Sequence, residues 1–369
     1  MTGPVIVGAR RLAVVPRGGG FRLLEIHQLA APVIAALLED AGLGREAVDE
    51  VILANALGGG GNPARLAALA AGLPERVGGL SVDRQCVGGM DAILLADALI
   101  RAGRHEVIAA GGAESYSRRP SRLRTDPGGG EAVPYDQPPF TPWPDRDPGM
   151  AEAAGALAER LGISREEQDA WAIASHARAL AAAPRLPAEI VPLSGIEADP
   201  FARRITARIC ARAPVLAGGV TTANTAVAAD GAAFCLLVSD RIARRLSTPR
   251  LRVLAGATLG ADPALPGLAP VPAIRAVLEE TGLEPAVFAA VELMEAFAVQ
   301  AIACARLAGL PAARVNRGGG ALARGHPIGA SGAINLTRLV HELGPGESGL
   351  AAIAAAGGLG TAVALERLA

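Results

Sequence analysis

Short runs of β-favouring apolar residues alternate along the chain with longer Ala-rich segments of helical spacing. Alternation of this kind is typical of α/β folds, in which helices pack on the faces of a sheet. In the first third of the chain we expect strands at residues 4–8, 50–55, 80–82 and 107–111, and helices at 24–41, 62–71 and 88–102.

The pattern changes in the middle of the chain. Residues 117–147 are rich in Pro, Arg and Gly and show no sustained period, which indicates loops. A helical stretch follows at 150–161, and Ser164 with Glu167 three residues later has the form of a capping box at the start of another helix. Regular alternation resumes near Asp230. We predict an N-terminal half at 1–117 that is completed by 229–247, an inserted loop domain at 118–228, and a C-terminal half at 248–369.

The two ends of the chain are similar to each other. Residues 106–115 and 348–361 are both apolar runs that lead into Ala-Gly-Gly. An Ala/Leu-rich helix is expected after Cys86, and a corresponding helix after His326. This weak repeat indicates a duplicated βαβ half, with the chemistry at the junction between the two halves.

Composition narrows the class of protein. The chain has 369 residues, 51% of them hydrophobic, which is enough for two or three sub-domains. It carries 35 basic and 36 acidic residues, a formal net charge of −1, so a nucleic-acid partner is not expected. The sequence contains no lysine, which excludes lysine Schiff-base chemistry and the phosphate-binding loop that ends in Lys-Ser/Thr.

The four cysteines are scattered and form no CxxC pair, so we expect reduced thiols and a cytoplasmic protein. No run of about 18 apolar residues is free of charges and turn signals, so no membrane span is expected. Histidines other than His326 lack partners at ligand spacing, and no metal site is expected. The cysteines that we expect to be structural are Cys210, Cys235 and Cys304.

Cys86 is the first candidate for chemistry. It follows a short β-type run and precedes a helix after a Gly-Gly turn. A cysteine at a helix N-terminus feels the positive end of the helix dipole, which lowers the thiol pKa and raises the thiolate fraction. The alternative is a buried, inert cysteine.

His326 is the second candidate. It lies between Gly325 and Pro327 on a loop ahead of a helix, where it could polarise a carbonyl or pair with a thiolate. The alternative is a structural loop histidine.

Two further features carry less information. Glu292 and Glu295 flank a strand-to-helix passage, and the glycines near Gly358 fit a turn between strands without forming a dinucleotide motif.

Together these segments resemble the thiolase family from the first strand to the C-terminus. The most specific motif is GHPIGASG at 325–332, and the order of the other segments also matches. The resemblance implies a duplicated five-layer αβαβα thiolase fold with an inserted loop domain that binds coenzyme A. It also implies a homodimer or homotetramer, with an acyl-CoA thioester as substrate and no permanently bound cofactor.

The resemblance also implies roles for individual residues. Cys86 would be the nucleophile that accepts the acyl group, and His326 would activate it and contribute to an oxyanion hole. The backbone N–H groups of Cys86 and Gly358 would form a second oxyanion hole, in which each donor contributes about 3–4 kcal/mol. The remaining substrate and coenzyme A positions would be Met150, Ala226 and Phe297.

Three departures from the family pattern affect the chemistry. Met294 replaces an asparagine that holds a water, and methionine cannot hold that water. Ala354 replaces the cysteine that deprotonates the second substrate. Ala226 and Ala229 replace a serine and an asparagine on the coenzyme A side. We therefore expect acyl loading to be retained and carbon–carbon bond formation to be impaired by about 2–4 decades, unless Glu295 supplies a base.

Three functions remain open at this point. The first is an acyltransferase of the acetyl-CoA acetyltransferase or 3-ketoacyl-CoA thiolase class. In a more specific variant of it, the acceptor is an amine, an alcohol or an already activated enolate, as in specialised biosynthesis. The second is a catalytically silent subunit that binds coenzyme A or acts as a scaffold for a partner protein. The third, a decarboxylative condensing enzyme, ranks lower because no suitable second histidine lies near Met294.

Overall fold

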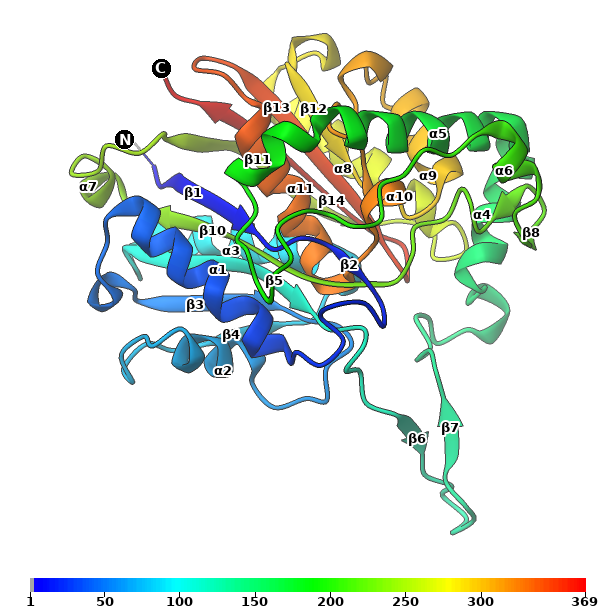
Figure 1. Ribbon diagram of the computed structural model, residues 1–369, viewed down its shortest axis with the longest axis horizontal. Coiled ribbons are helices and arrows are strands. Elements are labelled where there is room, and N and C mark those ends of the chain that lie inside the picture. The colour runs from blue at the N-terminus through cyan, green and yellow to red at the C-terminus, as the bar shows by residue number, and fades with distance from the viewer. Residues whose placement is uncertain (1–2) are drawn as a thin grey trace.

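The computed structural model describes residues 3–369. Its centre is a sheet with two wings, one from each half of the chain (Figure 1). The strands of the N-terminal wing are β1 (Val5–Arg11), β2 (Val15–Pro16), β3 (Glu50–Ala54), β4 (Leu80–Val82), β5 (Val107–Glu114) and β10 (Ala229–Val238). Those of the C-terminal wing are β11 (Leu251–Gly260), β12 (Ala290–Leu293), β13 (Ser348–Ala355) and β14 (Leu359–Arg367).

The two wings have related topologies. The N-terminal wing has the order β1–β10–β5–β3–β4, and the C-terminal wing has the order β11–β14–β13–β12. In each wing the inner strands pair antiparallel, whereas the outer strands β3, β4 and β12 pair parallel to their neighbours. Within the described residues the wings meet where Ile6 of β1 pairs with Leu251 of β11.

Helices form three layers around the two wings. The outer face of the N-terminal wing is covered by α1 (Ile26–Ala41) and α2 (Pro63–Ala70). Between the wings lie α3 (Gly88–Arg101) and α11 (Ile328–Glu342). The outer face of the C-terminal wing is covered by α8 (Pro270–Thr281) and α9 (Ala298–Leu307). This arrangement confirms the predicted five-layer αβαβα fold.

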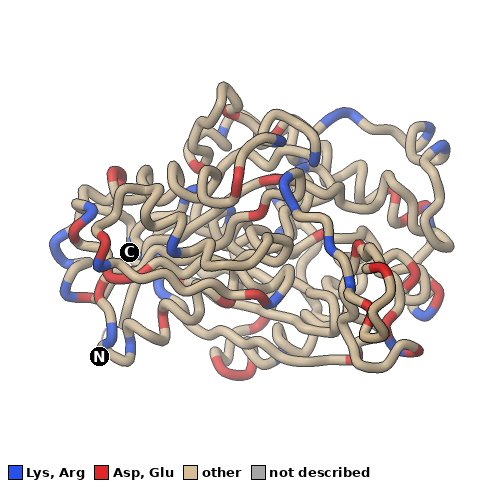
Figure 2. Tube along the Cα trace, turned by 90° about the horizontal axis from the view of Figure 1, so that it is seen from below, with Lys and Arg blue, Asp and Glu red and all other residues tan. Residues whose placement is uncertain are grey.

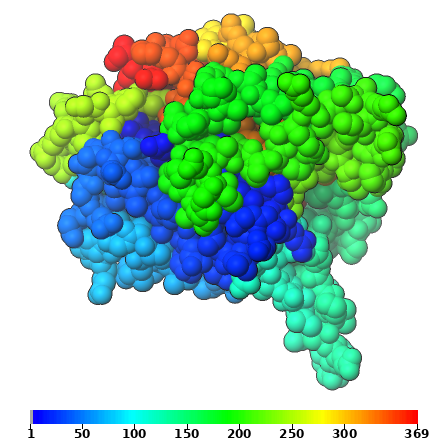
Figure 3. Space-filling view, in the orientation of Figure 1, coloured from blue at the N-terminus to red at the C-terminus, as the bar shows by residue number. Residues whose placement is uncertain are grey.

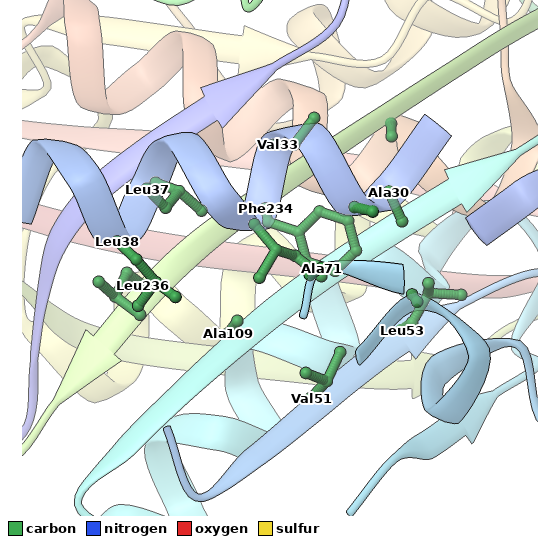
Figure 4. Close-up of a cluster of buried hydrophobic side chains, with 14 of the residues drawn as sticks. Ala30, Val33, Leu37, Leu38, Val51, Leu53, Ala71, Ala109, Phe234 and Leu236 are labelled. Carbon is green, nitrogen blue, oxygen red and sulfur yellow. The ribbon is translucent and has the colours of Figure 1, made fainter. Parts of the chain in front are cut away.

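Small and branched apolar side chains fill the space between the layers. Figure 4 shows the cluster in which Val33 and Leu37 of α1 pack toward Phe234 and Leu236 of β10. All four side chains are fully buried, and each burial stabilises the fold by about 1.5–3 kcal/mol.

The two central helices approach each other closely because glycines lie at their contact. A Cβ atom at Gly89 of α3 would come within 2.8 Å of the carbonyl oxygen of Gly329, and one at Gly332 within 2.6 Å of the backbone nitrogen of Met90. A side chain at either glycine would therefore force the helices apart. This close contact brings the N-terminal ends of α3 and α11 together at the junction between the halves.

The inserted middle segment follows the expected helices but contains one unexpected element. Ser164 caps α5 (Arg165–Ala182), since its Oγ accepts the N–H of Glu167 at 3.2 Å, as predicted. The carboxylate of Glu167 pairs with Arg306 instead of completing the capping box. Residues expected to be irregular form a hairpin of β6 (Arg122–Arg124) and β7 (Val133–Tyr135), which projects from the body of the molecule (Figure 3).

The remaining elements connect these layers. Strand β10 lies between β1 and β5 in the N-terminal wing, whereas the boundaries 118–228 and 229–247 themselves stay a prediction.

Acidic and basic residues are interspersed along the chain (Figure 2). No helix within residues 3–369 is both long and apolar enough to cross a bilayer. The other elements are α4 (Met150–Leu161), α6 (Ala207–Ala211), α7 (Asp240–Ala243), α10 (Ala321–Arg324), β8 (Val215–Ala217) and β9 (Val220–Thr221).

Candidate active site

Cys86 lies in a sharp turn between strand β4 and helix α3. It is the middle residue of the 3₁₀ turn Gln85–Val87, and Gln85 has a positive φ of 52°. The N–H of Gln85 donates to Oδ1 of Asp83 at 2.9 Å, which holds this strained turn. A strained turn at the mouth of a helix presents the following side chain toward an open site, a geometry that nucleophiles often adopt.

His326 is held by its backbone at the start of α11. The preceding Gly325 has a φ of 116°, and a Cβ atom there would come within 2.8 Å of the side chain of Ala229. The N–H of His326 donates to the carbonyl of Val227 at 2.8 Å. Glycine is therefore required at 325 both for its conformation and for the space that it leaves.

The imidazole of His326 connects the sulfur of Cys86 to a buried hydroxyl. Its Nε2 lies 3.2 Å from Sγ of Cys86, and its Nδ1 lies 2.7 Å from Oγ of Ser331. The hydroxyl of Ser331 donates to the carbonyl of Pro327 at 2.9 Å, so it accepts the proton on Nδ1. This network assigns the tautomer in which Nε2 is unprotonated and can accept the thiol proton.

The electrostatics differ from the sequence-based expectation of a ready thiolate. Burial raises the pKa of the Cys86 thiol to about 12, and the carboxylate of Glu114 adds to the effect. Burial also lowers the pKa of His326 to about 4. The predicted effect of the helix dipole is therefore outweighed, because desolvation disfavours both charged forms. The resting pair is a neutral thiol and a neutral imidazole.

Two backbone N–H groups face the sulfur of Cys86 and partly oppose the effect of burial. They belong to Cys86 itself and to Ala356, and both lower the thiol pKa. Gly358, which the sequence suggested as the second donor, lies two residues further along and does not line the cavity around the sulfur. Glycine is needed at position 358 because a Cβ atom there would come within 2.6 Å of the carbonyl oxygen of Ala261.

The Cys86–His326 pair opens into a cavity of about 260 Å³. Met150, Ala226 and Phe297, the three predicted substrate positions, all line this cavity. They come from three different segments: the start of α4, the residues before β10, and the residue before α9. The segment that contains Ala226 is joined to the segment that contains Phe297, because the N–H of Ala226 donates to the carbonyl of Ala296 at 2.9 Å.

The two altered family positions differ in their location. Ala354 lines the cavity, where its methyl group offers no proton donor or acceptor. Met294 is 2% exposed and packs in the apolar cluster between the wings, which Cys86 also contacts.

Glu295, the candidate substitute base, is fully occupied. Its carboxylate accepts hydrogen bonds from the indole of Trp171, the hydroxyl of Ser175, the amide of Asn316 and the N–H of Leu322. It is 1% exposed and is not part of the cavity wall. These contacts give Glu295 a structural role, so the hypothesis that it replaces the missing base is wrong.

Glu114 is a site residue that sequence reasoning missed. Its buried carboxylate accepts the N–H groups of Ala56, Leu57 and Gly329, and the amide of Asn55. It thus ties the loop before α2 to the first turn of α11, which follows His326. Burial raises the pKa of Glu114 to about 7, although these hydrogen bonds oppose the rise. Its position next to the Ala-Gly-Gly run was the available signal.

The other cysteines lie outside the cavity, although the sulfur of Cys304 is bonded to the carbonyl of Gly267 in the cavity wall. Cys210, Cys235 and Cys304 are fully buried and do not line the cavity. Within residues 3–369, no group of three or more His, Cys, Asp or Glu side chains is placed to hold a metal ion.

The fold and the site define an α/β enzyme in which a cysteine and a histidine from two similar halves meet at a cavity. Residues 4–241 match the model of the thiolase N-terminal domain, and residues 247–367 match that of the thiolase C-terminal domain. The chain belongs to the thiolase family, and it is an acyltransferase that depends on acyl-CoA.

Individual relatives extend over the full chain. An acetyl-CoA acetyltransferase of Pseudomonas aeruginosa is 40% identical, over 98% of this chain and 99% of that protein. The crystal structure of the Bacillus anthracis acetyl-CoA acetyltransferase is similar with a TM-score of 0.91 and 34% identity, over 100% of this chain and 99% of that one. The Acat5 thiolase from Ascaris suum, solved in complex with coenzyme A, is similar with a TM-score of 0.92 and 29% identity over 100% of both chains.

Proposed function

We propose that the chain transfers acyl groups from coenzyme A thioesters through an acyl-Cys86 intermediate. The observation that carries this proposal is the 3.2 Å contact between Nε2 of His326 and Sγ of Cys86 at the cavity. The similarity to a thiolase solved in complex with coenzyme A supports coenzyme A as the carrier. We include in the proposal a cytoplasmic location and a homodimer or homotetramer.

The first half-reaction follows from the neutral pair. Sγ of Cys86 attacks the thioester carbonyl while Nε2 of His326 takes the thiol proton, and a carbon–sulfur bond forms. We assign the backbone N–H groups of Cys86 and Ala356 to the oxyanion of the tetrahedral intermediate, in place of Gly358. The bond from carbon to the sulfur of coenzyme A then breaks, and the proton on His326 passes to the leaving thiolate.

The second half-reaction is limited by what faces the acyl group. Ala354 stands where the family has a cysteine base, and Glu295 is held by four hydrogen bonds away from the cavity. Without a positioned base, proton abstraction from carbon is slowed by about 2–4 decades. We therefore propose an acceptor that needs no carbon deprotonation, such as an amine, an alcohol or an already activated enolate.

Covalent labelling tests the shared first step. The full chain is incubated with radiolabelled acetyl-CoA, and label on protein is measured after denaturation. We expect label on the wild type and on Cys210→Ala, a control that changes a cysteine outside the cavity, and none on Cys86→Ala. An unlabelled wild type would overturn the proposal and favour the alternative of a subunit that only binds coenzyme A.

A further inference from the structure

The cavity that contains Cys86 has two chemically different walls. One wall is apolar and includes Met150, Leu157 and Phe297. The other comes from the segment after β5 and contains Tyr116, Arg119 and Arg122, followed by polar residues from the far side of the hairpin. A purely hydrocarbon acyl group carries no hydrogen-bond acceptor for two neighbouring guanidinium groups.

Both arginines are held in place by contacts within the protein. The guanidinium of Arg119 lies over the ring of Tyr116, 4.7 Å from its centroid, and pairs with Asp136 at 2.6 Å. Arg122 donates to the carbonyl of Ala56 at 3.2 Å. Arginine has five N–H donors in a planar fork, so each side chain keeps donors for a ligand. Their side chains are already ordered, which reduces the entropy lost on binding.

The charge of this wall is positive. Arg119 and Arg122 also line a neighbouring cavity of about 450 Å³, in which Arg17 adds a third guanidinium. Among the described residues that line either cavity, Asp136 supplies the one carboxylate, and its side chain is 78% exposed. An exposed carboxylate is well solvated and neutralises a neighbouring charge only weakly.

We propose that Arg119 and Arg122 form a subsite for a carboxylate at the far end of the acyl group, so that the substrates include dicarboxylic acyl thioesters. This inference rests on the proposed function, since the acyl group must be transferred to Cys86. The thioester carbonyl is attacked by Sγ of Cys86, and the distal carboxylate stays ionised and accepts hydrogen bonds from the two arginines. No atom of that carboxylate changes its bonds during the transfer.

The preference for the acyl end over the phosphates of coenzyme A follows from the two walls. The predicted pantetheine positions Met150, Ala226 and Phe297 lie at the start of α4, before β10 and before α9, whereas the arginines lie on the segment between β5 and β7, where Arg122 contacts Ala56 of the N-terminal half. A chain that enters along the apolar wall and reaches Cys86 can extend its acyl group toward the arginines. A phosphate of the carrier would supply the same anion chemistry, and the experiment below separates the two sources.

The test measures the rate of Cys86 acylation by intact-protein mass spectrometry. Succinyl-, glutaryl- and adipyl-coenzyme A are compared with butyryl-, valeryl- and hexanoyl-coenzyme A of the same chain lengths. We expect at least one dicarboxylic thioester to load about tenfold faster than its uncharged counterpart. Arg119→Gln and Arg122→Gln should each slow loading of the preferred dicarboxylic thioester by about 10–100-fold, the range for a hydrogen bond to a charged group, with the uncharged thioesters unaffected.

Two further variants separate charge recognition from a structural role. Arg124→Gln removes an arginine of the same hairpin that stacks on Tyr135 and does not line the cavity, and it should leave all rates unchanged. Asp136→Asn removes the competing carboxylate and should speed loading of the dicarboxylic thioesters only. A loss of folding would slow every substrate alike, so it cannot produce this pattern.

The two anion sources are separated with N-acetylcysteamine thioesters, which lack the phosphates of coenzyme A. If the arginines bind the acyl carboxylate, the succinyl thioester of N-acetylcysteamine keeps its dependence on Arg119 and Arg122. The inference is overturned if this dependence disappears, or if no dicarboxylic thioester of any length is preferred by the wild type. Loading by butyryl-coenzyme A alone would retain the proposed function and reject the subsite, whereas no loading by any thioester would reject both.

Discussion

His326 and Cys86 come from opposite halves of the duplicated fold and meet with 3.2 Å between Nε2 and Sγ. Each lies at the N-terminal end of the central helix of its half, α11 and α3 respectively. The glycine contacts between these helices set how closely the two ends approach. The distance between these two side chains is therefore a consequence of helix packing, and it depends on glycines that do not line the cavity.

The neutral state of this pair predicts the pH dependence of acyl loading. The free base of His326 is needed, and it is lost as pH falls through the His326 pKa. Because burial lowers that pKa to about 4, we expect the loading rate to stay nearly constant from pH 8 to pH 5. A solvated histidine would lose activity near its ordinary value of 6.5. Quenched-flow labelling across this range measures the profile.

Alkylation by iodoacetamide supplies the matched comparison for the pH profile, since it requires the thiolate itself. With a Cys86 pKa of about 12, its rate should keep rising from pH 6 to pH 9, in contrast to the flat loading rate. An acid limb of loading near pH 6.5, together with rapid alkylation at pH 6, would show a preformed ion pair and contradict this account.

Ser331 is predicted to position the imidazole. Ser331→Ala removes the acceptor for the Nδ1 proton, so the tautomer that can accept the thiol proton is no longer favoured. Loss of one hydrogen bond costs about 0.5–1.5 kcal/mol, which corresponds to about a 2–12-fold lower maximal loading rate with an unchanged half-saturating concentration. Ser247→Ala, at an exposed position, is the control. An effect on half-saturation alone would indicate a binding role instead.

Local signals in the sequence predicted much of the fold. The Ser164 cap, the bounds of α4 and the two helices after Cys86 and His326 follow from patterns within a few residues. The meeting of Cys86 with His326 came from the resemblance and the repeat. Each of these features depends on side-chain types that recur at a fixed spacing.

Other features of the site had no such signal. The donor at Ala356 is a backbone N–H, which leaves no mark on residue type, and the Cys86 pKa depends on burial by segments distant in sequence. The β6–β7 hairpin lies in a stretch rich in Pro and Gly, where composition indicates loops. In the sequence, Arg119 and Arg122 contribute only to the net charge, because only the fold shows that they line the cavity.

A buried ion pair between the loop segment and the two halves predicts a stability effect. Glu189 pairs with Arg11 at 2.6 Å and with Arg338 at 2.7 Å, and all three side chains are buried. Arg11 keeps its pair with Asp199 and Arg338 keeps its pair with Glu342. Glu189→Gln therefore removes charge-assisted hydrogen bonds without isolating a charge, and it should lower the free energy of unfolding by about 1.5–3 kcal/mol. Urea titration at pH 7 measures this change, with the exposed Glu197→Gln as control.

The same pair predicts a pH dependence of stability. Burial alone would raise the pKa of Glu189, but Arg11 and Arg338 outweigh it and lower the value from 4.5 to about 2. A depressed carboxyl pKa stabilises the fold above the unfolded value, and the contribution is lost as pH falls toward about 2. The difference between wild type and Glu189→Gln should therefore shrink between pH 5 and pH 2. A constant difference across this range would contradict the assignment.

The altered position Ala354 predicts a gain of function. Ala354→Cys places a thiol at the cavity wall, where the family resemblance puts the base for carbon deprotonation. Exchange of the methyl hydrogens of acetyl-CoA with deuterium oxide reports that step directly, without a requirement for condensation. We expect little exchange in the wild type and an increase of at least about tenfold in the variant, as part of the 2–4 decades that a positioned base contributes.

A matched variant distinguishes a base from an added thiol. Ala257→Cys adds the same group at a half-buried strand position on β11 that does not line the cavity, and should leave exchange near the wild-type rate. Met294 limits the increase in exchange, because Ala354→Cys does not restore the water that the family's asparagine holds at position 294. Ala354→Cys combined with Met294→Asn should therefore exceed Ala354→Cys alone. Equal exchange in the two cysteine variants would mean that the carbon acid is not presented to residue 354, and that the acceptor reaches the acyl-cysteine from another direction.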